Sequence, residues 1–195
     1  MKRDIILSGV GGQGILSIAT VIGWAALKEN LYLKQAEVHG MSQRGGDVQS
    51  NLRLGTDPIF SDLVPKGECD LIISLEPMEA LRYLPWLSPE GWVVTSTTPF
   101  VNIPNYPPIG EVMAELGQVP NLITLDCDSI AKEVRSPRSA NMVLLGASAR
   151  VLGILEPDNL KAGIEAVFAR KGEAVVQANI SAFNAGFEES GKFSK

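Results

Sequence analysis

Short apolar runs alternate with longer stretches of helical periodicity along most of the chain. Apolar runs of about four to eight residues bounded by glycine or polar residues are typical of buried strands, and apolar positions three or four residues apart are typical of helices. The predicted strands are residues 4–8, 32–38, 47–54, 69–75, 92–95 and 122–125. The predicted helices are residues 15–27, 77–87, 109–116, 128–134, 139–154, 157–170 and 173–187.

This alternation predicts an α/β fold, a three-layer α/β/α sandwich with a helical C-terminal third. The strand at 47–54 follows the strand at 32–38 through a loop that is too short for a helical crossover. The two are therefore expected to be antiparallel, which makes the sheet mixed. Residues 1–187 contain no internal repeat or long linker and are interpreted as a single domain. Residues 188–195 are interpreted as a frayed polar tail.

Local signals place the ends of two helices. Pro77 suits a first helical position, where its missing N–H does no harm, and the helix that follows is expected to carry Leu84 and Leu87. Asp128 is expected to cap a short helix that ends at Val134.

Four prolines mark residues 99–108 as an extended loop with little conformational freedom to lose on docking. We expect its apolar side chains to form a partner-covered surface; they are Phe100, Val101, Ile103 and Tyr106. The alternative is that the loop folds back onto its own domain.

Composition narrows the class of protein. The 195 residues are 45% hydrophobic and carry a net charge of −5, which is ordinary for a soluble domain and argues against nucleic-acid binding. Residues 5–27 are uncharged and superficially resemble an export signal or membrane span, but clustered glycines predict a strand, a turn and a helix instead. A cytoplasmic protein is therefore expected, with no membrane partner. The two cysteines lack the spacing of a zinc or iron–sulfur site.

The first candidate site is the glycine turn, residues 9–14, which reads Gly-Val-Gly-Gly-Gln-Gly. Its spacing between a strand and a helix matches the dinucleotide fingerprint, and Glu37 is near the place of the acidic residue which that fingerprint requires. The glutamine is not usual there, so a purely structural turn stays open. The candidate contact residues are Gly11, Gly12, Gln13 and Gly14.

The second candidate is the polar loop at residues 39–46, in which His39, Ser42 and Arg44 are the candidate contacts. Arginine between a polar residue and two glycines suits a carboxylate or phosphate. If the first two strands run in the same direction, this loop and the glycine turn share one edge of the sheet and could face one anionic group. The alternatives are a solvated surface loop and pairing of Arg44 with an acid such as Glu37 or Asp47.

The third candidate is Asn141, an amide at the start of an apolar helix. Such a residue is typically a cap or a buried bridge rather than a ligand contact.

Together these segments resemble a known family. Residues 9–16 (Gly-Val-Gly-Gly-Gln-Gly-Ile-Leu), 37–46 (Glu-Val-His-Gly-Met-Ser-Gln-Arg-Gly-Gly) and 141–146 (Asn-Met-Val-Leu-Leu-Gly) are similar to the gamma subunits of the 2-oxoacid:ferredoxin oxidoreductases. Asn179, Ala182, Phe183 and Gly186 also suit that family. The resemblance spans residues 1–187 and is greatest to the small (beta) subunits of the indolepyruvate:ferredoxin oxidoreductases.

The resemblance implies oxidative decarboxylation of a 2-oxoacid, such as indolepyruvate or another aryl pyruvate, on thiamine diphosphate. Electrons would pass through iron–sulfur clusters of the 4Fe–4S type to ferredoxin, with coenzyme A as co-substrate. The chain has neither a cluster-type cysteine run nor a Gly-Asp-Gly…Asn thiamine motif. We therefore expect an accessory subunit, inactive alone, whose large partner carries these cofactors and whose own residues line the substrate or coenzyme A channel. One alternative is a pure scaffold subunit with no contact to the active site, which the sequence does not distinguish from a channel-lining subunit. The other is a stand-alone dinucleotide-binding oxidoreductase.

Overall fold

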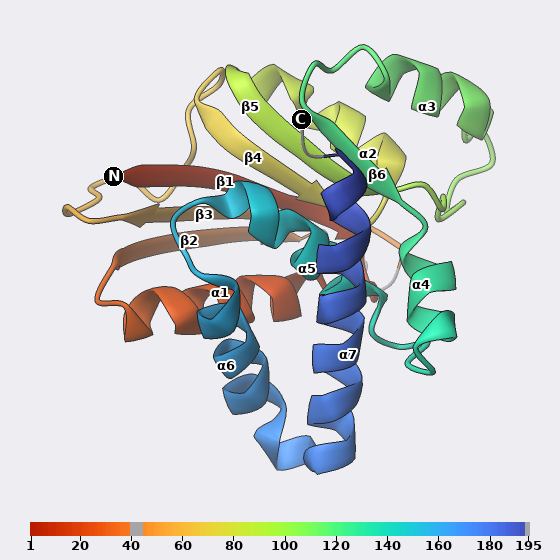
Figure 1. Cartoon of the computed structure of the whole chain (residues 1–195). Coiled ribbons are helices and arrows are strands. Elements are labelled where there is room, and N and C mark those ends of the chain that lie inside the picture. Colours follow the sequence, from red (N-terminus) through yellow and green to blue (C-terminus); the bar gives the residue numbers. More distant parts are fainter. Residues whose placement is uncertain (40–44, 194–195) are drawn as a thin grey trace.

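The computed structural model describes residues 1–39 and 45–193, with the side chain of residue 39 outside the description. In these residues six strands form one sheet in the order β2-β3-β1-β4-β5-β6 (Figure 1). The strands are β1 (Lys2–Val10), β2 (Tyr32–His39), β3 (Asp47–Gly55), β4 (Cys69–Ser74), β5 (Leu87–Ser96) and β6 (Leu122–Leu125). β3 is antiparallel to both of its neighbours, whereas β1, β4, β5 and β6 are parallel. The prediction of a mixed sheet is confirmed.

Helices cover both faces of the sheet, as predicted for three layers (Figure 1). They are α1 (Ile15–Lys28), α2 (Pro77–Arg82), α3 (Ile109–Leu116), α4 (Cys127–Glu133), α5 (Ala140–Leu152), α6 (Pro157–Phe168) and α7 (Glu173–Ser190). Ile5 and Leu7 of β1 pack into the larger core with α1, α5, α6 and α7, whereas Ile6 packs into a smaller core with α2 and α3. This division follows from the alternation of side chains along a strand.

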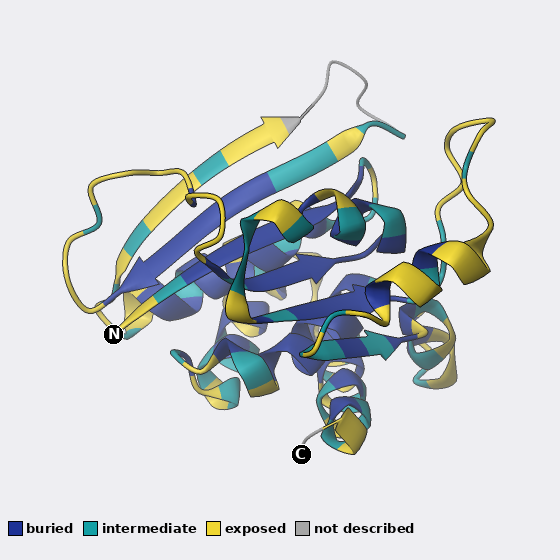
Figure 2. Ribbon diagram, turned by 90° about the horizontal axis from the view of Figure 1, so that it is seen from above, coloured by how far each residue is buried: buried dark blue, intermediate teal, exposed yellow. Residues whose placement is uncertain are grey.

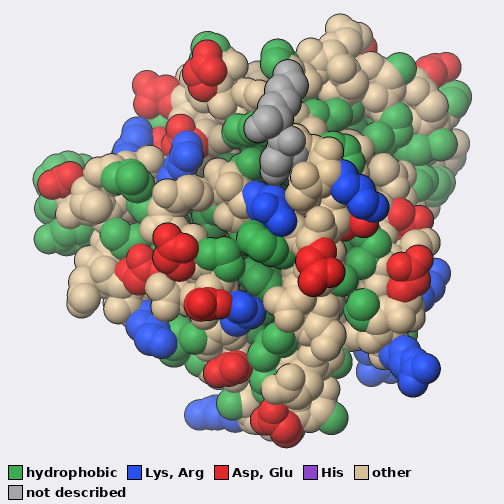
Figure 3. All heavy atoms as spheres, viewed as in Figure 1, with side chains coloured by type: hydrophobic (Ala, Val, Ile, Leu, Met, Phe, Trp, Pro, Cys, Tyr) green, Lys and Arg blue, Asp and Glu red, His purple; other side chains and the backbone are tan. Residues whose placement is uncertain are grey.

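Burial decreases from the centre of the sheet toward its edges. Figure 2 shows buried central strands, an exposed edge at β2 and exposed connecting loops. On the face drawn in Figure 3, basic and acidic side chains are interspersed. None of the described helices has both the length and the apolar character that crossing a membrane requires.

The helix that begins at Pro77 is shorter than predicted. It ends at Arg82, Leu84 lies in a 3-10 turn (Leu84–Trp86), and Leu87 begins β5. Pro85 explains the difference, because its ring and missing N–H do not fit a continuing α-helix. The prediction of one helix over residues 77–87 was therefore wrong.

The predicted cap of α4 was also wrong, by two residues. Asp126 accepts hydrogen bonds from the backbone N–H of Ser129 at 2.9 Å and from the Ser129 hydroxyl at 2.7 Å, and α4 begins one residue later. These bonds stabilise the ionised carboxylate and lower the pKa of Asp126. Asp128 is thereby free of the capping role.

The last helix does not fray at Glu188. α7 continues to Ser190 and a 3-10 turn follows (Gly191–Phe193). Arg150 of α5 donates from Nε to the Phe187 carbonyl at 2.8 Å and to the Ser190 hydroxyl at 3.1 Å. This contact from α5 gives the polar sequence a fixed partner, which local composition could not predict.

Helices α5 and α7 approach each other through two glycines. A Cβ added to Gly146 would lie 1.9 Å from the carbonyl oxygen of Phe183, and one added to Gly186 would lie 1.9 Å from that of Val143. Real Cβ atoms do not come this close to backbone oxygen. The two backbones therefore pack directly against each other.

Candidate functional site

The glycine turn forms the predicted strand–turn–helix connection between β1 and α1. Gly12 and Gly14 have φ angles of +104° and +84°, which residues with a side chain rarely adopt. Among the described residues no side chain caps the start of α1, and the first turn of α1 holds no acidic residue. The helix N-terminus therefore keeps its capacity to attract an anion.

Gln13 binds the ends of two parallel strands together. Its Oε1 accepts a hydrogen bond from the backbone N–H of Val10 at 2.7 Å, and its Nε2 donates to the carbonyl of Leu75 at 3.2 Å. Val10 ends β1 and Leu75 directly follows β4. This structural role accounts for a glutamine where a dinucleotide fingerprint does not require one.

Asn141 joins the first sequence motif to the third. Its Nδ2 donates to the carbonyl of Gly14 at 3.2 Å, and the residue is buried, with 8% exposed. A Cβ on Gly14 would lie 2.6 Å from that Nδ2 atom. Of the two structural roles considered, a cap and a buried bridge, the hydrogen bond shows the bridge, which fixes α5 against the start of α1. Contact of Asn141 with a ligand stays a prediction.

The second candidate loop, residues 39–46, lies at the same end of the sheet as the glycine turn. β1 and β2 are both antiparallel to β3, so they run in the same direction, as expected. Gly11 donates from its N–H to the carbonyl of Gly46 at 2.8 Å and accepts from the N–H of Gly45 at 3.4 Å. The described end of the loop therefore contacts the glycine turn.

The remaining residues of that loop lie outside the described residues. They include Ser42, Arg44 and the side chain of His39, so the shared anionic site stays a prediction. The two acids considered as partners of Arg44 have other described partners. Asp47 accepts from the Tyr83 hydroxyl at 3.1 Å, and Glu37 accepts from Gln35 at 2.6 Å.

A pocket of about 380 Å³ opens beside the glycine turn. Its lining residues are Gly12, Gln13, Leu75, Ser96, Cys127, Asp128, Pro137, Arg138, Ala140 and Asn141. They come from the carboxyl ends of β1, β4 and β5 and from the starts of α4 and α5. β1 leads into α1 on one face and β4 leads into α2 on the other, so the pocket lies where the crossovers change faces. Ligands of open α/β sheets bind at this place.

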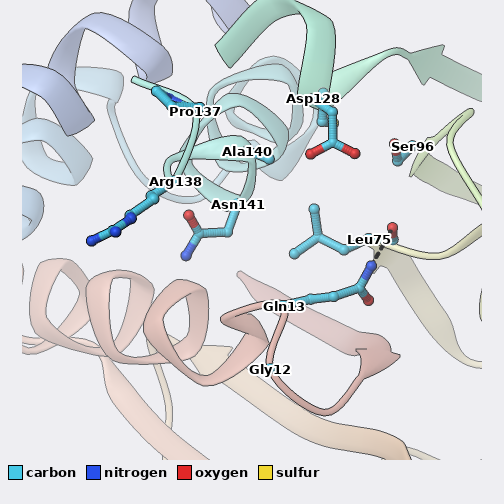
Figure 4. A pocket seen from close by; sticks show the side chains of 10 residues that line it. Gly12, Gln13, Leu75, Ser96, Asp128, Pro137, Arg138, Ala140 and Asn141 are labelled. Carbon is cyan, nitrogen blue, oxygen red and sulfur yellow. Dashed lines mark hydrogen bonds between the residues drawn. The ribbon is translucent and has the colours of Figure 1, made fainter. Parts of the chain in front are cut away.

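The pocket carries both signs of charge. Figure 4 shows the Asp128 carboxylate directed into the space between Asn141 and Ser96, whereas Arg138 extends away from it. Arg138 and the start of α1 favour an anionic group, and Asp128 suits a hydroxyl or N–H donor. The arrangement therefore fits a ligand that has both kinds of group.

The sequence prediction missed Ser96, Asp128 and Arg138. Ser96 ends β5 and Asp128 follows β6 closely, so the rule that ligands gather at carboxyl ends could have identified both. Arg138 lies in the loop before α5, and nothing in its local sequence distinguishes it from other surface arginines.

The two cysteines do not fit an iron–sulfur cluster. Cys69 lies in the smaller core and Cys127 in the larger one, on opposite faces of the sheet. Burial raises the pKa of each thiol to about 12, which disfavours the thiolate that binds iron. Across residues 1–39 and 45–193 no group of three or more potential metal ligands occurs.

Fold and site together define an open, doubly wound α/β domain with a glycine turn and a pocket at its switch point. Residues 4–189 match the family model described as pyruvate ferredoxin/flavodoxin oxidoreductase. This chain belongs to that family.

Two relatives match over nearly their whole length. The indolepyruvate oxidoreductase subunit IorB of Methanothermobacter thermautotrophicus is 36% identical, with 96% of this chain and 97% of the relative covered. IorB of Pyrococcus horikoshii is also 36% identical, with 95% and 94% covered.

Solved structures share the fold. The gamma subunit of a keto/oxoacid ferredoxin oxidoreductase from Geobacter sulfurreducens superposes with a TM-score of 0.74 at 24% identity, and the match covers 100% of this chain and 99% of that one. A 2-oxoglutarate:ferredoxin oxidoreductase from Magnetococcus marinus gives 0.76 at 22% identity, and the match covers 100% of this chain and 32% of that one. This domain therefore corresponds to about a third of the longer chain.

Proposed function

We propose that this chain is the small accessory subunit of a 2-oxoacid:ferredoxin oxidoreductase that acts on indolepyruvate or related aryl pyruvates. The observation that carries the proposal is the 36% identity to IorB subunits over almost the full length of both chains. More distant relatives are subunits of enzymes named for other oxoacids, such as 2-oxoglutarate synthase subunit KorC, which is 28% identical. The greater identity to IorB favours the aryl substrate class.

The reacting cofactors belong on a larger partner. Thiamine diphosphate supplies the decarboxylation chemistry in such an enzyme, and iron–sulfur clusters carry the electrons to ferredoxin. A cluster needs several cysteine thiolates, whereas this chain has two cysteines, both buried and in different cores. This chain therefore completes the complex rather than performing the redox step.

The pocket beside the glycine turn is our candidate for contact with the oxoacid or coenzyme A. The free start of α1 and Arg138 supply attraction for a carboxylate or phosphate, and Asp128 supplies an acceptor for a hydroxyl. Asn141 and Gln13 are held by hydrogen bonds to the strand and turn backbones, so the pocket wall is preorganised. The role of these residues is to bind and orient a ligand at the subunit boundary.

A thermal-shift experiment separates this function from that of a dinucleotide-dependent oxidoreductase. We expect the melting temperature of the isolated chain to be unchanged by millimolar NADH, NADPH or FAD. A dinucleotide present at 100 times its Kd would stabilise the fold by about 2.7 kcal/mol. For a domain of this size that raises the melting temperature by several degrees. A shift of that size would favour the dinucleotide alternative and count against the subunit assignment.

A further inference from the structure

The loop between β5 and α3 presents apolar side chains to solvent. Phe100, Val101 and Ile103 are 42%, 67% and 36% exposed, as expected, whereas Tyr106 is partly buried against the smaller core. Figure 2 shows the loop extending away from the body of the domain. No residue between 97 and 108 carries a charge. The exposed surface of this loop is therefore uncharged and rich in apolar side chains, with Asn102 and Asn105 as its exposed amides.

The backbone of this loop is nevertheless held in place. Glu76 is buried and caps α2 through a hydrogen bond from the N–H of Glu79 to its Oε2 at 2.9 Å. Its other oxygen accepts the N–H of Phe100 at 3.3 Å and the Tyr106 hydroxyl. One carboxylate thus fixes both arms of the loop. Because the backbone is fixed, the exposed side chains cannot collapse onto their own domain, and docking costs little entropy.

The loop is also tied to the candidate site. Asn102 donates from Nδ2 to the carbonyl of Gly45 at 2.7 Å. Gly45 and Gly46 are in turn bonded to Gly11 of the glycine turn. A protein that covers the loop therefore borders the glycine turn as well.

We propose that residues 99–108 form a preordered docking loop, which places Phe100, Val101 and Ile103 in an uncharged apolar recess of the large cofactor-bearing subunit. The proposal rests on the proposed function, because that function supplies the large subunit. Because the loop carries no charge, the recess that receives it is expected to be uncharged and apolar as well. The link through Asn102 places the docked subunit beside the glycine turn, where ligand contact requires it.

The test compares affinities of the large subunit for variants of this chain, measured by isothermal titration calorimetry. The docking variant is F100S/V101S/I103S. Phe60→Ser is the matched control, because Phe60 is 94% exposed and lies in the loop after β3. The end of β3 pairs with the start of β1, so this loop lies at the amino ends of the parallel strands, whereas the docking loop follows the carboxyl end of β5. We expect the docking variant to bind at least about 100-fold more weakly, because two of the three apolar anchors, at about tenfold each, already give that loss. The control should bind as the unaltered chain does.

The melting temperature of each variant checks folding, and Val101→Asp repeats the test with a single exposed change. Equal binding of the docking variant would overturn the docking loop and leave the subunit assignment standing. Failure of the unaltered chain to bind the large subunit would overturn both. Self-association of the unaltered chain that the docking variant abolishes would assign the loop to a second copy and overturn the proposal.

Discussion

Replacing Gly146 with alanine is expected to destabilise the domain by about 3 kcal/mol or more, near the upper end of overpacking effects. The new Cβ would lie 1.9 Å from the Phe183 carbonyl oxygen, 2.8 Å from its carbon and 3.0 Å from the Phe187 nitrogen. All three atoms are backbone, so relief requires the two helices to move apart. For a chain of this length the melting temperature should fall by about 10 °C.

Gly110→Ala is the matched control for this change. Gly110 lies in α3 and a Cβ there would meet no atom within 4 Å. Alanine has the higher helix propensity, so the control should be neutral or slightly stabilising. A Gly146 variant within about 1 kcal/mol of the unaltered chain, in the same denaturation series, would show that α5 and α7 are not in backbone contact.

Replacing Arg138 with alanine is expected to raise the KM for the oxoacid or for coenzyme A about tenfold in the assembled enzyme. Arg138 extends away from the pocket in the structure, so its side chain must turn toward an anionic group to bind it (Figure 4). A charge-assisted hydrogen bond made in this way is worth about 1.5–3 kcal/mol, and the exposure of Arg138 places it at the lower limit. Because the residue binds rather than reacts, kcat should change little. Steady-state kinetics with each substrate varied in turn measures both constants.

Arg170→Ala is the control, since Arg170 is exposed in the turn after α6 and is not among the residues that line the pocket. Arg138→Lys should retain part of the affinity, because charge is kept while the planar fork is lost. If both KM values of the Arg138→Ala enzyme match those of the unaltered complex, the pocket does not contact substrate through this residue.

Most of the fold could be predicted from local patterns. The helix at 109–116 and the strand at 122–125 have their predicted bounds, because apolar periodicity and flanking turn residues both mark them. The two errors in helix boundaries occurred where a single residue determines where the helix begins or ends. Pro85 stops α2, and the choice between Asp126 and Asp128 as a cap depends on backbone angles that composition does not show.

The site was harder to predict from the sequence than the fold, because its contacts join distant parts of the chain. Asn141 and Gly14 are 127 positions apart, and Gln13 meets Leu75 across 62 positions. Local spacing identified the glycine turn and Asn141 as special but did not show that they touch. Asp128 and Arg138 line the pocket only because α4 and the loop before α5 fold over the ends of the strands.

The subunit assignment is tested most directly by reconstitution. The measurement is viologen reduction with indolepyruvate and coenzyme A, by this chain alone, by the large thiamine diphosphate and iron–sulfur subunit alone, and by the two mixed. We predict background rates for each part alone and indolepyruvate-dependent reduction by the mixture. Viologen reduction by this chain alone, or a large subunit whose rate does not change when this chain is added, would contradict the account.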